Sequence, residues 1–109
     1  MGTISVGDVV FVSFPFSDLS ASKKRPALVL AVLDKNDLIL CQITSKAYAD
    51  KNAVEITKND FPHGELLKTS YVRPSKFFTA NTTIVFSNVA QLKETTHQSI
   101  VLKIIKLIS

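Results

Sequence analysis

Short runs of β-branched and aromatic residues alternate with polar, turn-forming stretches over most of the chain. Each run has the length of a strand and is bounded by glycine, proline or a polar cluster, which predicts a mainly β protein. The run Pro26–Leu33 is apolar almost throughout, so we expect it to be a central, buried strand. The expected strands are Asp8–Pro15, Pro26–Leu33, Leu38–Thr44, Ala53–Thr57, one around Tyr71-Val72-Arg73 within Leu66–Phe78, and Thr82–Phe86.

Polar segments separate these strands. Asp34-Lys35-Asn36-Asp37 has the composition of a tight turn, so the strands on either side of it should form a hairpin. Longer polar loops are expected at Phe16–Lys24, Ser45–Asn52 and Lys58–Glu65.

The last segment changes period, which predicts a helix over Lys93–Ile108. Its apolar residues recur at helical spacing, and they could serve either the core or a dimer contact. They are Val101, Ile104, Ile105 and Ile108. Several short strands followed by one helix predict a small, mostly antiparallel barrel or curled sheet closed by a C-terminal α-helix. No repeat or linker divides the chain, so residues 1–109 are expected to form a single domain.

Composition narrows the class of protein without naming a function. The 109 residues are 46% hydrophobic, which favours a folded domain, and a net charge of +4 favours weak attraction to nucleic acid or another anion. The single cysteine, Cys41, lies in an apolar strand and is expected to be a buried core residue in a reducing compartment. Without a secretory signal or an apolar run of membrane-spanning length, the sequence predicts a cytoplasmic protein with no membrane partner.

Several kinds of chemistry find no support in the sequence. His63 and His97 are far apart, with no cysteine or carboxylate at metal-ligand spacing, so no metal or other cofactor is predicted. His97 is expected at the surface, and His63 is a loop residue for which a general-base role stays open. The aromatic residues Phe11, Phe14 and Phe16 favour core packing over a base-stacking platform.

The chain has two arginines among its 13 basic residues, Arg25 and Arg73, and a proline directly follows each. A residue before proline favours extended geometry, so both should project from strand ends or flanking loops. The planar guanidinium fork suits phosphate better than the point charge of lysine, which points to an anionic, nucleic-acid ligand. The alternative is that both form surface ion pairs with carboxylates.

Four segments appear in a characteristic order: Gly7-Asp8-Val9-Val10, Lys23-Lys24-Arg25-Pro26 before an apolar strand, Gln42-Ile43-Thr44-Ser45, and Ser70-Tyr71-Val72-Arg73. No single segment is decisive, but their order and spacing together are specific. The pattern resembles the PemK/MazF family, the toxins of bacterial toxin–antitoxin pairs. The resemblance runs from Gly7 to the C-terminal helix.

The resemblance implies an SH3-like small barrel of the PemK/MazF/CcdB type, usually a homodimer, that cleaves single-stranded RNA such as mRNA without a metal. It also implies a small acidic antitoxin that covers the dimer and its RNA groove, and binding to operator DNA only through that antitoxin. The expected outcome of the activity is growth inhibition.

The resemblance also assigns site residues. The family's loop arginine corresponds to Arg25, its strand end to Ile43-Thr44-Ser45, and a second catalytic arginine to Arg73. The guanidinium groups would stabilise charge on the phosphate, while Thr44 and Ser45 would orient it or the 2′-hydroxyl. Flanking phosphates would be held by Lys23, Lys24 and Lys46.

Two departures leave the general base open. Ser75 stands where one branch of the family has a carboxylate, and Leu19-Ser20 stands where some relatives have a His-Glu pair. Ser75 could orient the phosphate, and Asp18 or His63 could supply the missing base. Two alternatives to the ribonuclease therefore remain: a binding toxin like the related gyrase poisons, or a degenerate homologue that binds RNA or antitoxin without turnover.

Overall fold

A computed structural model describes residues 3–14, 23–46, 50–64, 66 and 68–109. Within these ranges the chain forms one antiparallel sheet and one α-helix. The strand order is β4-β6-β3-β2-β1-β7-β5. The elements are β1 Asp8–Phe14, β2 Lys23–Val32, β3 Asp37–Thr44, β4 Val54–Ile56, β5 His63–Gly64, β6 Ser70–Asn81, β7 Val85–Gln91 and α1 Glu94–Ile108, with 3-10 turns at Asp34–Asn36, Lys58–Asp60 and Thr82–Ile84.

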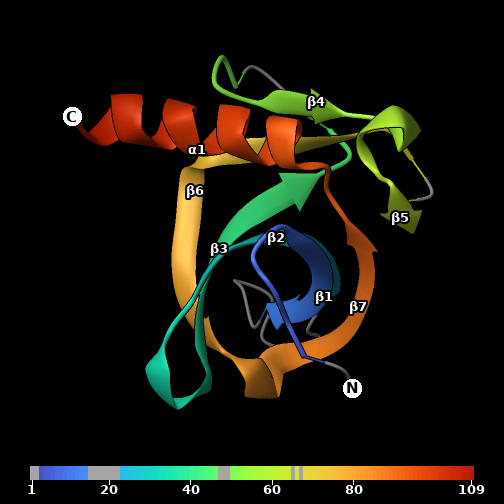
Figure 1. Cartoon of the computed structure of the whole chain (residues 1–109), viewed down its shortest axis with the longest axis vertical. Coiled ribbons are helices and arrows are strands. Elements are labelled where there is room, and N and C mark those ends of the chain that lie inside the picture. Colours follow the sequence, from blue (N-terminus) through green and yellow to red (C-terminus); the bar gives the residue numbers. More distant parts are fainter. Residues whose placement is uncertain (1–2, 15–22, 47–49, 65, 67) are drawn as a thin grey trace.

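The sheet curls upon itself, and α1 lies across one end of the ring beside β4 (Figure 1). The curl follows from long strands with register shifts, as in the β1–β7 and β2–β3 ladders. This arrangement confirms the predicted mainly β fold closed by a C-terminal helix. No helix of the described residues is long and apolar enough to cross a membrane.

The hairpin predicted around Asp34–Asp37 is present, and its turn is tight enough to put Lys35 and Asn36 at positive φ. Three expectations about the loops and strands were wrong. The strand predicted over Thr82–Phe86 begins as a 3-10 turn, because the Asn81 side chain caps that turn by accepting a hydrogen bond from the Thr83 backbone N–H. The loop expected over Lys58–Glu65 contains a capped 3-10 turn and the short strand β5. The polar loop expected over Phe16–Lys24 gives way to β2 at Lys23, and Phe16 to Ser22 lie outside the described residues.

The core forms two clusters, one on each side of the curled sheet. The cluster beneath α1 includes Leu28, Cys41 and Ile43 from the sheet, and Ile100 and Ile104 from the helix. Cys41 is fully buried in this cluster, which confirms it as a core residue, and burial raises the pKa of its thiol to about 12. The other cluster fills the opposite side with residues of β1, β2, β3 and β7.

Of the four apolar residues predicted along α1, only one is fully in the core. Ile104 is buried and Val101 is half-buried, whereas Ile105 and Ile108 are exposed. Helical spacing correctly identified the helix but not which side of its apolar stripe the sheet covers.

Candidate functional site

A hollow of about 330 Å³ lies where β2 begins and β3 ends. Its apolar lining comes from β1, β2 and β3 and from the segment that precedes β6, whereas its polar lining is cationic or hydroxyl-bearing. The lining residues are Phe11, Lys24, Arg25, Pro26, Ile43, Thr44, Ser45, Leu66, Lys68 and Ser70. Such a combination suits a ligand with a flat apolar part and a negative charge.

Strand register explains why these residues meet. Antiparallel pairing sets Pro26 opposite Phe11, and Arg25 is the next residue toward the start of β2. Thr44 ends β3, where its hydroxyl oxygen accepts a hydrogen bond from the Lys46 backbone N–H at 3.2 Å. The structure therefore brings the predicted residues Lys24, Arg25, Thr44 and Ser45 to one hollow. Lys46 is exposed just beyond the strand end.

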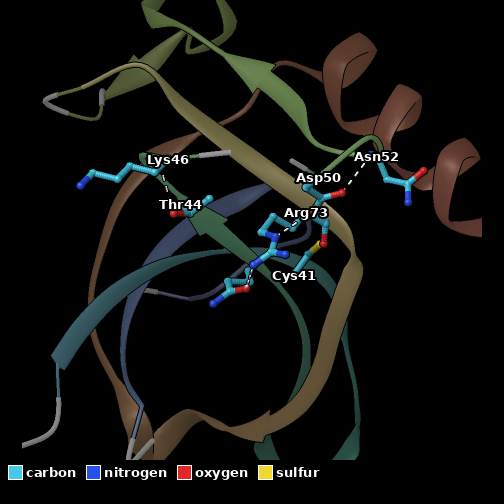
Figure 2. Close-up of polar contacts among 7 residues, drawn as sticks. Cys41, Thr44, Lys46, Asp50, Asn52 and Arg73 are labelled. Atoms are coloured by element: carbon cyan, nitrogen blue, oxygen red, sulfur yellow. Dashed lines mark hydrogen bonds and ion pairs between the residues drawn. The ribbon is translucent and has the colours of Figure 1, made fainter. Parts of the chain in front are cut away.

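Arg73 lies on the neighbouring strand β6, where its guanidinium is fixed by two side chains (Figure 2). Its Nε donates to Oδ2 of Asp50 at 2.8 Å, and one terminal nitrogen donates to Oε1 of Gln42 at 3.3 Å. The Asp50 side chain is only 8% exposed and that of Arg73 is 24% exposed. A guanidinium has five donors, so these contacts orient the fork while leaving donors for a ligand.

The carboxylate of Asp50 is itself held in place. One oxygen receives the Arg73 bond and the other accepts from the Asn52 backbone N–H at 2.9 Å. The hydrogen bond from Arg73 and then that from Asn52 lower the pKa of Asp50 below its ordinary value, against a smaller opposing effect of burial. Asp50 is therefore a fixed negative charge beside Arg73 at neutral pH.

A four-residue bulge in β6 contains Arg73. In the β3–β6 ladder, Cys41 pairs with Phe77 and Ile43 with Val72, so four residues of β6 face the single residue Gln42. The Cys41 thiol donates to the Arg73 carbonyl at 3.0 Å within this bulge. Bulges commonly redirect side chains near functional sites. Arg73 is therefore inside a strand, not at the strand end or loop that the Arg-Pro sequence predicted.

The bulge also contains Pro74 and Ser75. Pro74 has no N–H to leave unpaired there, and Ser75 is exposed. Gln42 and Thr44 point to the same face of β3, because side chains alternate along a strand, so the Arg73 group adjoins the Thr44 end of the hollow. Among the described residues Arg73 does not line the hollow itself.

The two arginines thus have different surroundings. The alternative of an ion pair with a carboxylate holds for Arg73, whereas within the described ranges Arg25 forms no ion pair. Arg25 is half-buried with its charge next to the hollow, which makes it available to an anion.

Lys24 is exposed at the rim, and its Nζ lies 4.3 Å from the centre of the Phe86 ring. The side chain of Lys23 lies outside the described residues, as do Asp18 and Leu19-Ser20. The backbone of Lys23 begins β2, which puts this residue on the same strand as Arg25.

The aromatic and histidine predictions need correction. Phe11 is half-buried, belongs to neither buried cluster and lines the hollow. Phe14 and Phe16 have no described side chains. His97 is half-buried, not at the surface, and burial lowers its pKa. His63 is exposed in β5 and lines a different hollow with Asp8.

Sequence reasoning missed Gln42, Asp50, Lys68 and Phe86. Gln42 stood in the quoted Gln42-Ile43-Thr44-Ser45 segment, so its polar place in an apolar strand was a usable signal. Asp50 is 23 residues from Arg73, and nothing local links the two. No group of three or more histidine, cysteine, aspartate or glutamate side chains in the described part of the chain could hold a metal ion.

Taken together, the hollow is lined by three hydroxyls, two lysines and the Arg25 guanidinium, which has no ion pair among the described residues, and the oriented guanidinium of Arg73 lies beside it. Preorganised donors of this kind stabilise negative charge that develops on a bound phosphate.

Comparison with known proteins identifies the family of this chain. Residues 5–108 match the sequence profile of the PemK-like, MazF-like toxins of type II toxin–antitoxin systems. No curated protein matches the sequence significantly.

Solved structures share the fold at low sequence identity. A MazE–MazF structure from Deinococcus radiodurans has a TM-score of 0.80 at 16% identity, covering 99% of this chain and 97% of the other. An endoribonuclease in complex with its cognate antitoxin, from a mycobacterial species, has a TM-score of 0.74 at 13% identity, covering 99% and 95%. The Mycobacterium tuberculosis toxin MazF-mt6 has a TM-score of 0.71 at 15% identity, covering 93% and 95%. With a family match over nearly its whole length and the matching fold, this chain belongs to the PemK-like, MazF-like toxins of type II toxin–antitoxin systems.

Proposed function

We propose that this chain is the toxin of a toxin–antitoxin pair and acts as a metal-independent endoribonuclease on single-stranded RNA such as mRNA. The observation that carries the proposal is the meeting of Arg25, Thr44 and Ser45 around one hollow, beside an Arg73 already oriented by Asp50. The mycobacterial structure of the same fold is named as an endoribonuclease, which supports the proposed activity at the level of the family.

In the proposed reaction the 2′-oxygen attacks the adjacent phosphorus. The O2′–P bond forms and the P–O5′ bond breaks, which leaves a 2′,3′-cyclic phosphate and a 5′-oxygen that takes up a proton to become a hydroxyl. Arg25 stabilises the charge that builds on the non-bridging oxygens, where losing one donor costs about 100-fold or more in rate. Thr44 and Ser45 orient the phosphate or the 2′-hydroxyl by hydrogen bonds, and Arg73 supplies a second fork of donors.

The proton of the 2′-hydroxyl needs an acceptor, and the sequence offers Asp18 and His63 for this role. His63 lies in β5 and lines a hollow with Asp8 that does not include Arg25 or Thr44, so its position does not favour this role. We therefore propose that Asp18 supplies the base in place of the carboxylate that one branch of the family has at the position of Ser75.

The proposal extends to partners. RNA is bound by Lys24, Ser45 and Lys46 with Lys23, and the toxin acts in the cytoplasm as a homodimer. A small acidic antitoxin, through which the pair binds operator DNA, inhibits it. A structural relative solved with its cognate antitoxin supports the antitoxin. Sedimentation at micromolar concentration tests the dimer, and a fully active species that stays monomeric would rule it out.

One observation favours the degenerate homologue as a second candidate: Ser75 is exposed in the β6 bulge and cannot supply the carboxylate of its relatives. Incubation of purified protein with a long, weakly structured RNA in excess chelator distinguishes the two. The ribonuclease predicts fragments that end in cyclic phosphate. RNA binding without fragments would favour the degenerate homologue, and cleavage that requires added magnesium or manganese would contradict the metal-independent reaction.

A further inference from the structure

Phe86 is an exposed aromatic residue next to the candidate site. It lies in β7 directly after the buried Val85, yet 52% of its surface is exposed. Single exposed apolar residues are common on proteins, so exposure alone carries no function. A binding role for Phe86 has to be argued from the surroundings of its ring.

The backbone at Phe86 is irregular in a way that presents the ring. In the β1–β7 ladder Val12 pairs with Val85 and Phe11 pairs with Ser87, so Phe86 is an additional residue with no partner of its own in β1. An extra residue of this kind bends the strand and turns a side chain out of the regular alternation. Its neighbour Val85 keeps its place in the core, so the bulge exposes Phe86 without opening the core.

Lys24 connects this ring to the hollow. Its Nζ lies 4.3 Å from the ring centre, and the same side chain lines the hollow with Arg25 and Thr44. A cation over an aromatic face occupies the position where another flat, polarisable group could stack. The result is a continuous surface with an aromatic ring, then a lysine, then the guanidinium proposed to hold the scissile phosphate.

We propose that Phe86 is a stacking site for an unpaired nucleobase of the RNA, next to the nucleotide whose phosphate enters the hollow. On binding, the base takes the ring face and Lys24 moves from the ring to a backbone phosphate. Stacking on an aromatic ring tolerates every base, so the site adds affinity without strong sequence selection. The identity of the ligand as RNA rests on the proposed function.

The absence of tryptophan from this chain makes the proposal directly testable. Phe86→Trp introduces a single tryptophan, whose fluorescence reports on that position, and a 2′-O-methyl RNA oligonucleotide serves as a probe that cannot be cleaved. Phe77→Trp is the matched control, because Phe77 is also exposed, at 43%, and lies on β6 outside the residues that line the hollow. We expect saturable quenching for Trp at position 86 and little change at position 77. Equal quenching at both positions, or none at position 86, would overturn the proposal.

Affinity gives a second readout. Phe86→Ala should weaken binding of the same oligonucleotide by about 5- to 150-fold, the range that corresponds to the loss of one stacked base. Phe77→Ala should bind like the unmodified chain, and Lys24→Ala should reduce the salt dependence of binding by about one phosphate contact. A melting temperature close to that of the unmodified chain checks that Phe86→Ala is folded.

The two proposals can fail separately. Binding with site-specific quenching but no cleavage would leave the stacking site in place and remove the ribonuclease. Cleavage with an unchanged affinity in Phe86→Ala would leave the ribonuclease and remove the stacking site.

Discussion

The Asp50–Arg73 ion pair should be both a stabilising and a positioning contact, and replacing either residue tests this. The Asp50 side chain is 8% exposed and the Nε–Oδ2 distance is 2.8 Å, so the pair is largely shielded from solvent. A charged hydrogen bond in such surroundings contributes about 1.5–3 kcal/mol. Asp50→Asn keeps the shape and removes the charge, so we expect it to lower the free energy of unfolding by about that amount.

Arg73→Ala should cost at least as much, because it leaves the buried carboxylate without its main partner. Breaking a fully buried pair costs about 3–5 kcal/mol. Here the Asn52 N–H still binds Asp50 and Arg73 is 24% exposed, so we expect the lower end of that range. The double variant Arg73→Ala/Asp50→Asn should recover part of the loss, with a coupling energy of about 0.5–3 kcal/mol.

Urea unfolding at pH 7 measures all four members of this cycle, and thermal melts should move by about 4–8 °C for each kcal/mol. Additive losses would refute a direct interaction between the two side chains. The pKa of Asp50 is lowered in the folded state, so the stability it contributes is present above its ordinary value of 3.8 and is lost as the pH falls through the folded value. Asp50→Asn should therefore flatten the acid limb of the stability curve, and an unchanged limb would contradict the assignment.

Two further predictions concern the base and a half-buried histidine. Ser75→Asp should raise the single-turnover cleavage rate and Asp18→Asn should lower it, because general-base catalysis typically contributes about 100- to 10,000-fold to the rate. Unchanged or lower rates in Ser75→Asp across neutral pH would mean that Ser75 only orients the phosphate. Burial lowers the pKa of His97, and its Nδ1 is buried with no hydrogen-bond partner among the described residues, so stability should fall as the pH drops below the ordinary value of 6.5. Urea midpoints at pH 7.5 and 5.5 should converge in His97→Gln but not in the exposed control His63→Gln, and equal pH dependence in both variants would exclude His97 as the cause.

Much of the fold could be predicted because local pattern and tertiary packing agree. The apolar runs that form β1, β3 and β4 match their predicted positions, β2 contains its predicted run but begins earlier, at Lys23, and the 3.6-residue period identified α1 almost to the residue. The turn at Thr82–Ile84 was missed because β-branched residues favour strands, whereas the Asn81 cap stabilises a turn there.

The candidate site was predictable only in part. Arg25 and Thr44 could be identified because each lies in a recognisable segment of the chain. The contacts of Arg73 could not be identified, because Asp50 reaches it from another loop and Gln42 reaches it across a bulge. The same limit applies to Phe86, whose exposure depends on a register shift between β1 and β7 that no local pattern encodes.

The most direct test of the central claim is the single-turnover rate of RNA cleavage in chelator for Arg25→Ala and Arg25→Lys. Arg25 lines the hollow and forms no ion pair within the described ranges, so removing its guanidinium should leave the fold intact. We expect Arg25→Ala to lose about 100-fold or more in rate and Arg25→Lys to recover little, because lysine keeps the charge but not the planar fork. An Arg25→Ala variant that cleaves RNA at the full rate would contradict the claim.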